Sequence, residues 1–311
     1  MRNPRPLPVE LSAVPFTVYE AADAGVSAGR LRHRGLSIPS RGVRIPAQLA
    51  ALDPLARVRP YTIVTPFSAA SHATAFTLWN LPEFLPGSDD GRIHISRPDT
   101  MAIVRRTGVV GHVGQFFADE IVTLNGLLIT SRTRTWLDCA RKMSVAELTV
   151  VADHLLRIPR PDFECRSGPY ARPADLAEML DRHKGTPGIQ KARRALEQAR
   201  IGSDSAPETK LRLALEYRGL PEPQLNIPVE LGTGVVRQSD LAYPEQRVAV
   251  EYEGEGHSET AQIVRDIARE EDFARAGWML VRISRRHMED EARAAIAKVR
   301  SALMNRGWSP K

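Results

Sequence analysis

Residues 235–254 read VVRQSDLAYPEQRVAVEYEG, and this stretch decides the fold of the C-terminal third of the chain. The strand-like runs on either side of Pro244–Arg247 predict two antiparallel strands joined by a four-residue turn. In that register Asp240 lies directly opposite Glu251. The sequence therefore predicts a β-hairpin that carries two facing carboxylates.

Directly opposed like charges are unfavourable in a sheet unless something neutralises them, and a divalent cation would do so. Strand alternation places Glu253 on the same face as Glu251. Glu208, in the first turn of the helix expected over residues 205–219, is a candidate fourth acid. Oxygen-only ligands of this kind suit Mg²⁺ or Mn²⁺. We expect a metal site at the hairpin, and an exposed acidic face on an antiparallel sheet is the alternative.

The segments around the hairpin are expected to follow the order helix, three strands, helix, strand, helix. Periodicity and capping residues place them at about 205–219, 224–229, 235–243, 247–254, 263–276, 278–284 and 289–303. His257 follows the second hairpin strand, Arg269 belongs to the next helix, and Arg282 belongs to the last strand, on the side of the carboxylates.

This order of elements, with acids at the hairpin, resembles the restriction-endonuclease-like PD-(D/E)XK fold. It is more closely similar to the domain of unknown function 559, which is related to the very-short-patch-repair (Vsr) mismatch endonucleases. The matching residues are Asp240, Glu251-Tyr-Glu-Gly254, His257, Asp266, Arg269 and Gly277-Trp278. The resemblance implies an α/β/α nuclease domain over residues 203–311. One position departs from the pattern, because Glu253 stands where the (D/E)XK triplet has its lysine. The neighbouring subfamily commonly has an acid at this position, with a histidine after it, and this chain fits that subfamily.

The mechanism expected on this basis is metal-dependent hydrolysis of DNA. Asp240 and Glu251, with the carbonyl oxygen of Tyr252, would hold Mg²⁺, which polarises the scissile phosphate and lowers the pKa of a bound water. His257 is the expected general base because it is the nearby group with a suitable unperturbed pKa, and a plain turn residue is the alternative. The further expected roles are phosphate stabilisation by Arg269 or Arg282, and metal binding or orientation by Glu253.

An arginine-rich module is expected over residues 1–55, since residues 1–60 carry nine arginines against four acids. Thr17 and Glu20 form the capping box of one short helix, Ser27 caps a second, and residues 37–46 are typical of a β-hairpin. Together they predict a winged helix-turn-helix, whose second helix reads DNA. The candidate DNA-binding residues are Arg30, Arg32, Arg34, Arg41 and Arg44. The alternative is a small helical pair with a solvated arginine face.

Three motifs in this module resemble the N-terminal winged-helix domain of the AbiEi antitoxin family, from bacterial type IV toxin–antitoxin systems. They are Phe16-Thr-Val-x-Glu-Ala, Gly25-Val-Ser and Arg41-Gly-Val-Arg. Residues 58–160 are similar to the second domain of these antitoxins, notably at Ser71-His-x-Thr-Ala75 and Arg134-Thr-Trp-Leu-Asp138. The resemblance implies DNA binding at a promoter and a toxin partner.

The middle region, residues 58–160, is expected to be a mixed α/β domain with a structural or bridging role. Its histidines, His72, His94 and His112, match no metal-ligand spacing. Gly111-His-Val-Gly114 lacks the spacing of a phosphate-binding loop. Residues 161–202 are predicted to form a linker that carries a basic helix near 189–200.

The composition restricts the class of protein. The chain has 311 residues, a net charge of +6 and 42% hydrophobic residues, which is enough for packed cores in two or three domains. Its two cysteines, Cys139 and Cys165, exclude a disulfide scaffold and an all-cysteine zinc site. It shows no secretory signal and no run of about 18 apolar residues, so we expect a soluble cytoplasmic protein with no membrane partner.

The sequence thus predicts an α+β multidomain protein: a winged helix-turn-helix, a mixed α/β middle domain and a restriction-endonuclease-like α/β/α domain. Its expected function is a DNA-binding, divalent-metal-dependent endonuclease targeted to double-stranded DNA by the N-terminal module. The alternative is an AbiEi-type antitoxin or transcriptional regulator whose nuclease-fold domain is inactive. A toxin–antitoxin fusion or a defence effector is a third reading.

Overall fold

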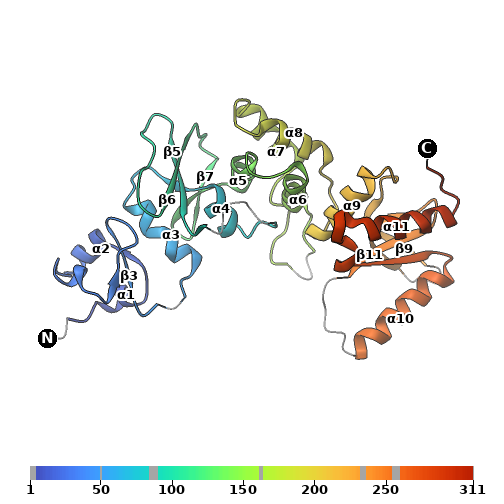
Figure 1. Ribbon diagram of the computed structural model, residues 1–311, viewed down its shortest axis with the longest axis horizontal. Helices are drawn as coiled ribbons and strands as arrows, with labels where there is room; N and C mark the ends of the chain where they lie inside the picture. The colour runs from blue at the N-terminus through green and yellow to red at the C-terminus, as the bar shows by residue number, and fades with distance from the viewer. Residues whose placement is uncertain are drawn as a thin grey trace. The chain divides into compact units, whose positions relative to one another are not determined.

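The computed structural model describes residues 5–49, 51–83, 90–160, 164–231, 236–253 and 260–310, with the side chains of these ranges apart from 260–266. Within them the protein is a mixed α+β structure with eleven α-helices and three open sheets (Figure 1). Its internal contacts define two compact units. Unit 1 comprises Met1–Ser144 and Ala174–Ala192, and unit 2 comprises Val145–Pro173 and Arg193–Lys311. The chain therefore enters unit 2, returns to unit 1 and enters unit 2 again.

The first part of unit 1 is a small sheet of three strands in the order β1-β3-β2 with two short helices. Its elements are α1 (Val9–Ser12), β1 (Phe16–Thr17), α2 (Val18–Asp23), β2 (Leu36–Ser37) and β3 (Val43–Pro46). Phe16, Leu31 and Leu36 form part of its core. The predicted capping box is confirmed, because the Thr17 and Glu20 side chains each bond the backbone N–H of the other residue.

The prediction of a second helix after Ser27 is wrong. Ser27 Oγ does accept the Arg30 N–H at 3.3 Å. However, the chain then forms a single 3₁₀ turn, η1 (Arg30–Arg32), and His33 is extended. Glycines at 29 and 35 leave too few good helix formers between them to offset the cost of helix nucleation. The predicted hairpin does form, since β2 pairs antiparallel with β3.

The second part of unit 1 is a five-stranded sheet in the order β6-β5-β4-β8-β7. Its strands are β4 (Ala69–Ala70), β5 (Ile93–Pro98), β6 (Val109–Gly114), β7 (Ile121–Leu124) and β8 (Leu127–Thr130), and its helices are α3 (Pro54–Ile63), α4 (His72–Leu78), α5 (Arg132–Cys139) and α7 (Pro173–Arg182). Strands β5 and β6 are parallel. Apolar side chains of α3 and α4 share one core with Ile95 and Ile129 of the sheet.

Unit 2 contains a four-stranded sheet in the order β12-β11-β10-β9. Its elements are α6 (Val145–Leu156), α9 (Ala206–Tyr217), β9 (Gln224–Glu230), β10 (Val236–Tyr243), β11 (Val248–Glu253), α10 (Thr260–Arg275), β12 (Met279–Ser284), η3 (Arg285–Met288) and α11 (Glu289–Asn305). From α9 onward the helices and long strands follow the predicted order. The first three strands form an antiparallel meander, and β12 pairs parallel with β11.

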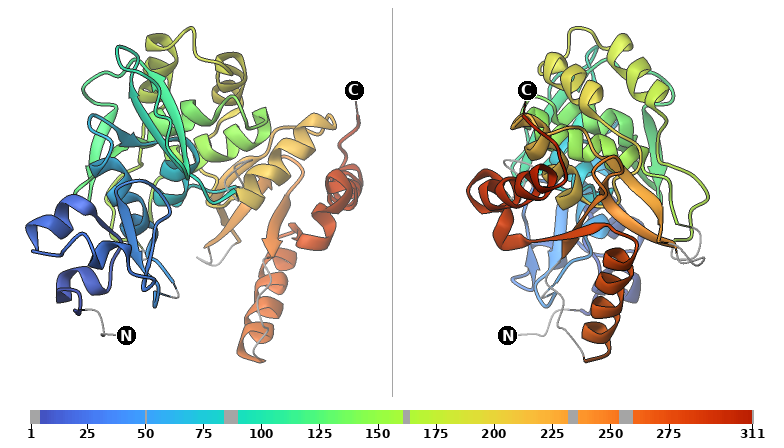
Figure 2. Two further views of the ribbon diagram at one scale, coloured as in Figure 1. Left: turned by 60° about the vertical axis from the view of Figure 1, so that its left-hand side comes forward. Right: turned by 90° about the vertical axis from the view of Figure 1, so that its right-hand side faces the viewer.

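Helices cover both faces of this sheet, with α10 opposite α11 (Figure 2). Val248 and Val250 point to the face on which α9 and α11 pack. Ala249 points to the other face, where it contacts the core formed with Phe273 of α10. The predicted alternation of β11 is therefore confirmed, and Glu251 and Glu253 belong to the α10 face.

The segment predicted as a linker, residues 161–202, contains α7 and α8 (Ile189–Gln198), and α8 matches the expected basic helix. Both helices are parts of the compact units. The division into domains at residues 55, 160 and 203 remains a prediction, and the two compact units have other bounds. None of the described helices is both long enough and apolar enough to cross a membrane.

Candidate functional site

The hairpin of unit 2 brings Asp240 and Glu251 together in the predicted register. The turn closes with an Arg247 N–H to Pro244 carbonyl bond of 3.1 Å. The strands pair from Tyr243↔Val248 to Leu241↔Val250, so the next residues along the ladder are Asp240 and Glu251. The backbone N–H of Tyr252 donates to Asp240 Oδ2 at 2.8 Å, which fixes the carboxylate beside β11.

Glu208 approaches the same place from the first turn of α9. Its buried carboxylate accepts bonds from the Ser205 hydroxyl at 2.7 Å and the Asp204 N–H at 2.9 Å, while Ser205 caps the helix. Asn226 Nδ2 also donates to it at 3.2 Å. Asn226 has a positive φ of 46° and interrupts the β9–β10 pairing opposite Asp240. The three acids thus come from α9, β10 and β11.

The electrostatic consequence is a strong rise in the pKa of Asp240 to about 7. Burial is the largest cause, and repulsion by Glu208 and Glu251 adds to it, whereas the Tyr252 N–H and Arg269 act in the opposite direction. A carboxyl group with this pKa is half protonated near neutral pH. A cation at this position would favour loss of that proton.

Glu251 is already paired with a cation of the protein. Arg269, on α10, donates from Nε to Glu251 Oε1 at 2.7 Å, and its Nη2 bonds the same oxygen and the Gln238 carbonyl. The repulsion for which the sequence suggests a metal ion is therefore partly relieved by this guanidinium group. At the rim, Arg282 Nη1 pairs with Glu253 Oε1 at 3.1 Å.

The donor chemistry of this site fits Mg²⁺ or Mn²⁺, because it offers carboxylate oxygens close enough to raise the pKa of Asp240. The arrangement of these side chains, however, does not form a metal site. Within the described residues, no group of three or more His, Cys, Asp or Glu side chains is placed to hold a metal ion. Binding of a cation by Glu251 Oε1 would require Arg269 to withdraw. His257 and the side chain of Asp266 lie outside the described residues.

The five candidate DNA-binding arginines divide into two groups. Arg32, Arg34 and Arg41 are exposed. Arg44 instead donates to the carbonyls of Leu31 at 2.7 Å and Val43 at 2.9 Å. Arg30 Nε donates to the Arg5 carbonyl at 2.9 Å. These two arginines stabilise the module itself, so the exposed three are the stronger candidates for contact with DNA.

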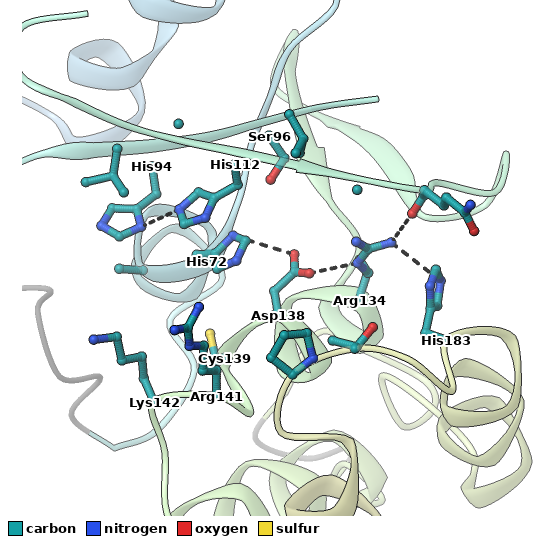
Figure 3. A pocket seen from close by; sticks show the side chains of 18 of the residues that line it. His72, His94, Ser96, His112, Arg134, Asp138, Cys139, Arg141, Lys142 and His183 are labelled. Carbon is teal, nitrogen blue, oxygen red and sulfur yellow. Dashed lines mark hydrogen bonds and ion pairs between the residues drawn. The ribbon is translucent and has the colours of Figure 1, made fainter. Parts of the chain in front are cut away.

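Unit 1 contains a pocket that the sequence does not predict, lined by His72, His94 and His112 (Figure 3). His72 and His112 stack with ring centroids 3.5 Å apart, and His94 Nδ1 lies 3.1 Å from His112 Nε2. The parallel pairing of β5 with β6 places His94 and His112 on one face of the sheet, and α4 begins at His72 beside them. Sequence spacing carries no signal for this, because it does not reveal which strands pair.

A buried charged network borders these histidines. Arg134 Nε donates to Asp138 Oδ1 at 2.8 Å (Figure 3). Arg134 Nη1 donates to Glu120 Oε2 at 2.5 Å and to the Gln115 carbonyl at 2.7 Å. His183 Nε2 lies 2.6 Å from Glu120 Oε1. Arg134 and Asp138 are thus part of a buried, hydrogen-bonded wall of the pocket.

Comparison with known proteins gives two relatives, both from Mycobacterium tuberculosis: the uncharacterized proteins Rv2248 of strain H37Rv and MT2308 of strain CDC 1551. Each is 30% identical to this chain over 182 residues, which is 58% of this chain and 64% of the relative. The match thus spans a little under two thirds of each relative. No protein-family model matches the chain. No solved structure matches it significantly.

Proposed function

We propose that unit 2 is a divalent-cation-dependent endonuclease that hydrolyses phosphodiester bonds in DNA, and that the N-terminal arginines bring it to its substrate. The observation that carries this proposal is the convergence of Asp240, Glu251 and Glu208 at one place, where burial and, after it, repulsion by the other two acids raise the pKa of Asp240 to about 7. Structural ion pairs normally lower the pKa of a carboxyl group, whereas clustered acids that raise one another's pKa are typical of functional sites.

Each residue of the site has a defined task in this proposal. Asp240 and Glu251, with the Tyr252 carbonyl, would hold the cation, which would supply Lewis-acid polarisation of the phosphate and a water of lowered pKa. Glu208 keeps the site negative in the absence of the cation. Arg269 is placed to exchange Glu251 for a phosphate oxygen, because its guanidinium already lies at the carboxylate. His257 remains the predicted general base.

The resemblance to Vsr-like and PD-(D/E)XK nucleases supports the proposal through the order of elements in unit 2. An antiparallel meander followed by a helix and a parallel strand is observed, with acids on the second and third strands. Fold alone does not establish chemistry, so the site must be tested directly.

The test is cleavage of supercoiled and mismatched duplex DNA by the full chain with Mg²⁺, with Mn²⁺ or with EDTA. We expect nicking in the presence of either metal and none with EDTA. Asp240→Asn and Glu251→Gln should each reduce the rate by at least about 100-fold, because each removes a charge that holds the cation.

Glu245→Gln is the matched control, since Glu245 is an exposed acid at the turn of the same hairpin. This variant should cleave DNA like the unmodified protein. Absence of cleavage with every substrate and metal, in a protein that still binds DNA, would contradict the nuclease proposal. Equal activity of Asp240→Asn and the unmodified protein would place any cleavage elsewhere.

A second candidate function has a specific observation in its favour. Arg269 holds Glu251, and the lysine of the nuclease triplet is replaced by Glu253, which pairs with Arg282. This pairing is what an inactive nuclease fold would retain for stability. The chain would then be an AbiEi-like regulator that binds DNA without cutting it and acts with a toxin partner. Under this function the chain would bind promoter DNA more tightly than DNA of unrelated sequence, and it would cleave neither with any metal ion.

A further inference from the structure

The histidine-lined pocket of unit 1 is large enough for a small-molecule ligand. It encloses about 760 Å³, within the range usual for ligand sites. Its walls come from α4, β5, β6, α5 and residues 182–187, which begin at the last residue of α7. All of them belong to unit 1, so the pocket is complete without unit 2.

Three histidines of the pocket, His72, His94 and His112, are neutral at physiological pH. Burial lowers the pKa of His72 to about 3 and that of His112 to about 3, and burial also lowers the pKa of His94. A neutral imidazole is a flat aromatic ring with one N–H donor and one acceptor nitrogen. The inner wall therefore suits a planar heterocycle whose edge carries both donors and acceptors.

Two polar atoms of this wall have no hydrogen-bond partner within the described part of the chain: Asp138 Oδ2 and His94 Nε2. Only 5% of the Asp138 side chain is exposed, and the neutral ring of His72 has its Nδ1 3.9 Å from Oδ2, too far for a hydrogen bond. Its other oxygen, Oδ1, is held by Arg134. Leaving such atoms unpaired is costly, so the wall presents a fixed acceptor for an N–H group of a ligand.

The rim of the pocket is cationic. Arg141, Lys142 and Lys184 line it, and all three are exposed. Among the described residues, none of these three side chains has a carboxylate partner, whereas the other cations of the lining are ion-paired. Three uncompensated positive charges around one opening favour an anionic group, and phosphate is the usual one.

We propose that this pocket binds a nucleoside phosphate, with the base at Asp138 and His94 and the phosphate at Arg141, Lys142 and Lys184. One molecule of this class carries both a planar ring with N–H donors and a multiply charged anion. A metal ion is not the occupant that the lining suits, because no group of three ligating side chains is formed among the described residues. The nucleotide is either free or part of a nucleic acid, and the proposal does not depend on the site of unit 2.

The test is calorimetric titration of the full chain with the four nucleoside monophosphates, the matching nucleosides and inorganic phosphate. At least one monophosphate should bind, and its nucleoside should bind about tenfold more weakly, because it has no anionic group to accept charge-assisted hydrogen bonds. Lys142→Ala and Lys184→Ala should weaken the monophosphate about tenfold and leave the nucleoside unchanged. Asp138→Asn should weaken both ligands alike, with folding verified by circular dichroism.

Arg293→Ala, which removes an exposed charge of α11 in unit 2, is the control and should bind like the unmodified protein. No heat with any monophosphate at millimolar concentration would overturn the proposal. So would equal weakening in the Arg293→Ala variant, which would indicate attraction by net charge alone.

A competition experiment separates the two sources of the nucleotide. A labelled single-stranded DNA oligomer is bound to the chain, and the monophosphate that binds best is added to saturation. Displacement of the oligomer from the unmodified protein, with weaker oligomer binding by Lys142→Ala, assigns the pocket to a nucleotide of DNA. Retention of the oligomer at saturation assigns it to the free nucleotide.

Discussion

Asp240 shows how one carboxyl group can report on a whole site. Its strand partner, Glu251, is paired with Arg269. Burial and the neighbouring acids nevertheless raise the pKa of Asp240 to about 7. The proton of Asp240 and a bound cation therefore compete for the same oxygen atoms. Any ligand that removes this proton also changes how stability depends on pH.

We predict that the metal-free protein loses stability as the pH rises from about 5 to 8. The folded pKa of Asp240, about 7, lies above its ordinary value of 3.8. The folded state thus holds a proton that the unfolded state releases, and its stabilisation is lost as the pH rises through 7. The loss should be on the order of 3 kcal/mol, and urea unfolding at each pH measures it.

Asp240→Asn is the control for this pH dependence, because an amide does not titrate. Its stability should change much less over the same range. Addition of Mg²⁺ should stabilise the unmodified protein more at pH 8 than at pH 6, where the cation must displace a proton. A pH profile that is the same in both proteins would assign the titration to another group.

At this scale the sequence predicted the acids of unit 2 but not their partners. The register of Asp240 and Glu251 follows from a four-residue turn, which is local information. The Arg269–Glu251 pair depends on how α10 crosses the sheet, and nothing in the spacing of these residues specifies that angle.

Among the elements, the helices α6 and α9 of unit 2 are joined by a buried ion pair. Arg212 Nη2 lies 2.9 Å from Asp153 Oδ2, and both side chains are almost fully buried. Asp153 also accepts bonds from the Thr209 hydroxyl at 2.9 Å and the Arg200 N–H at 2.7 Å. The network thus connects the loop before α9 to both helices.

We predict that Arg212→Met destabilises the protein by about 3–5 kcal/mol, since it leaves Asp153 buried without its charged partner. Chemical denaturation of the full chain measures the change. The double variant Arg212→Met/Asp153→Leu should recover much of the loss, because it removes both charges. The single variant Asp153→Leu completes the comparison. If the double variant loses as much stability as Arg212→Met and Asp153→Leu lose together, packing rather than charge controls this interaction.

Elements with strong local signals were predicted well. Ser205 caps α9 as expected, and the hairpin β10–β11 has the predicted pairing. The prediction for the segment after Ser27 was wrong. Its arginines suggested a recognition helix, whereas the chain forms only the 3₁₀ turn η1 between Gly29 and the extended His33. A cluster of arginines is compatible with an anionic partner, but it does not specify helical backbone.

For the whole molecule, charge is distributed unevenly along the sequence. Residues 1–60 carry nine arginines against four acids. We predict that Arg32→Ala, Arg34→Ala and Arg41→Ala each reduce the salt dependence of DNA binding, lowering the slope of log K against log salt by about one for each phosphate that is no longer neutralised. Fluorescence anisotropy at several salt concentrations measures the slope. Arg293→Ala should leave it unchanged, and a reduction as large as in the other variants would contradict the prediction.

The pocket of unit 1 belongs to this scale, and it could not be predicted from the sequence. It needs α4 to begin beside two strands whose parallel pairing joins residues 93–98 to 109–114, and it needs residues 182–187 to return to unit 1. Contacts at such sequence separation leave no periodic pattern. The spacing of His72, His94 and His112 therefore gives no indication that their rings lie together.

The interleaved order of the two units has a consequence for synthesis on the ribosome. Unit 1 is not finished when residue 144 has been made, because Ala174–Ala192 complete it after Val145–Pro173 have been added for unit 2. His183, which bonds Glu120 in the wall beside Arg134, is among these late residues. A nascent chain must therefore hold an unfinished pocket, with Glu120 awaiting one of its two partners, while the first helix of unit 2 is already leaving the exit tunnel.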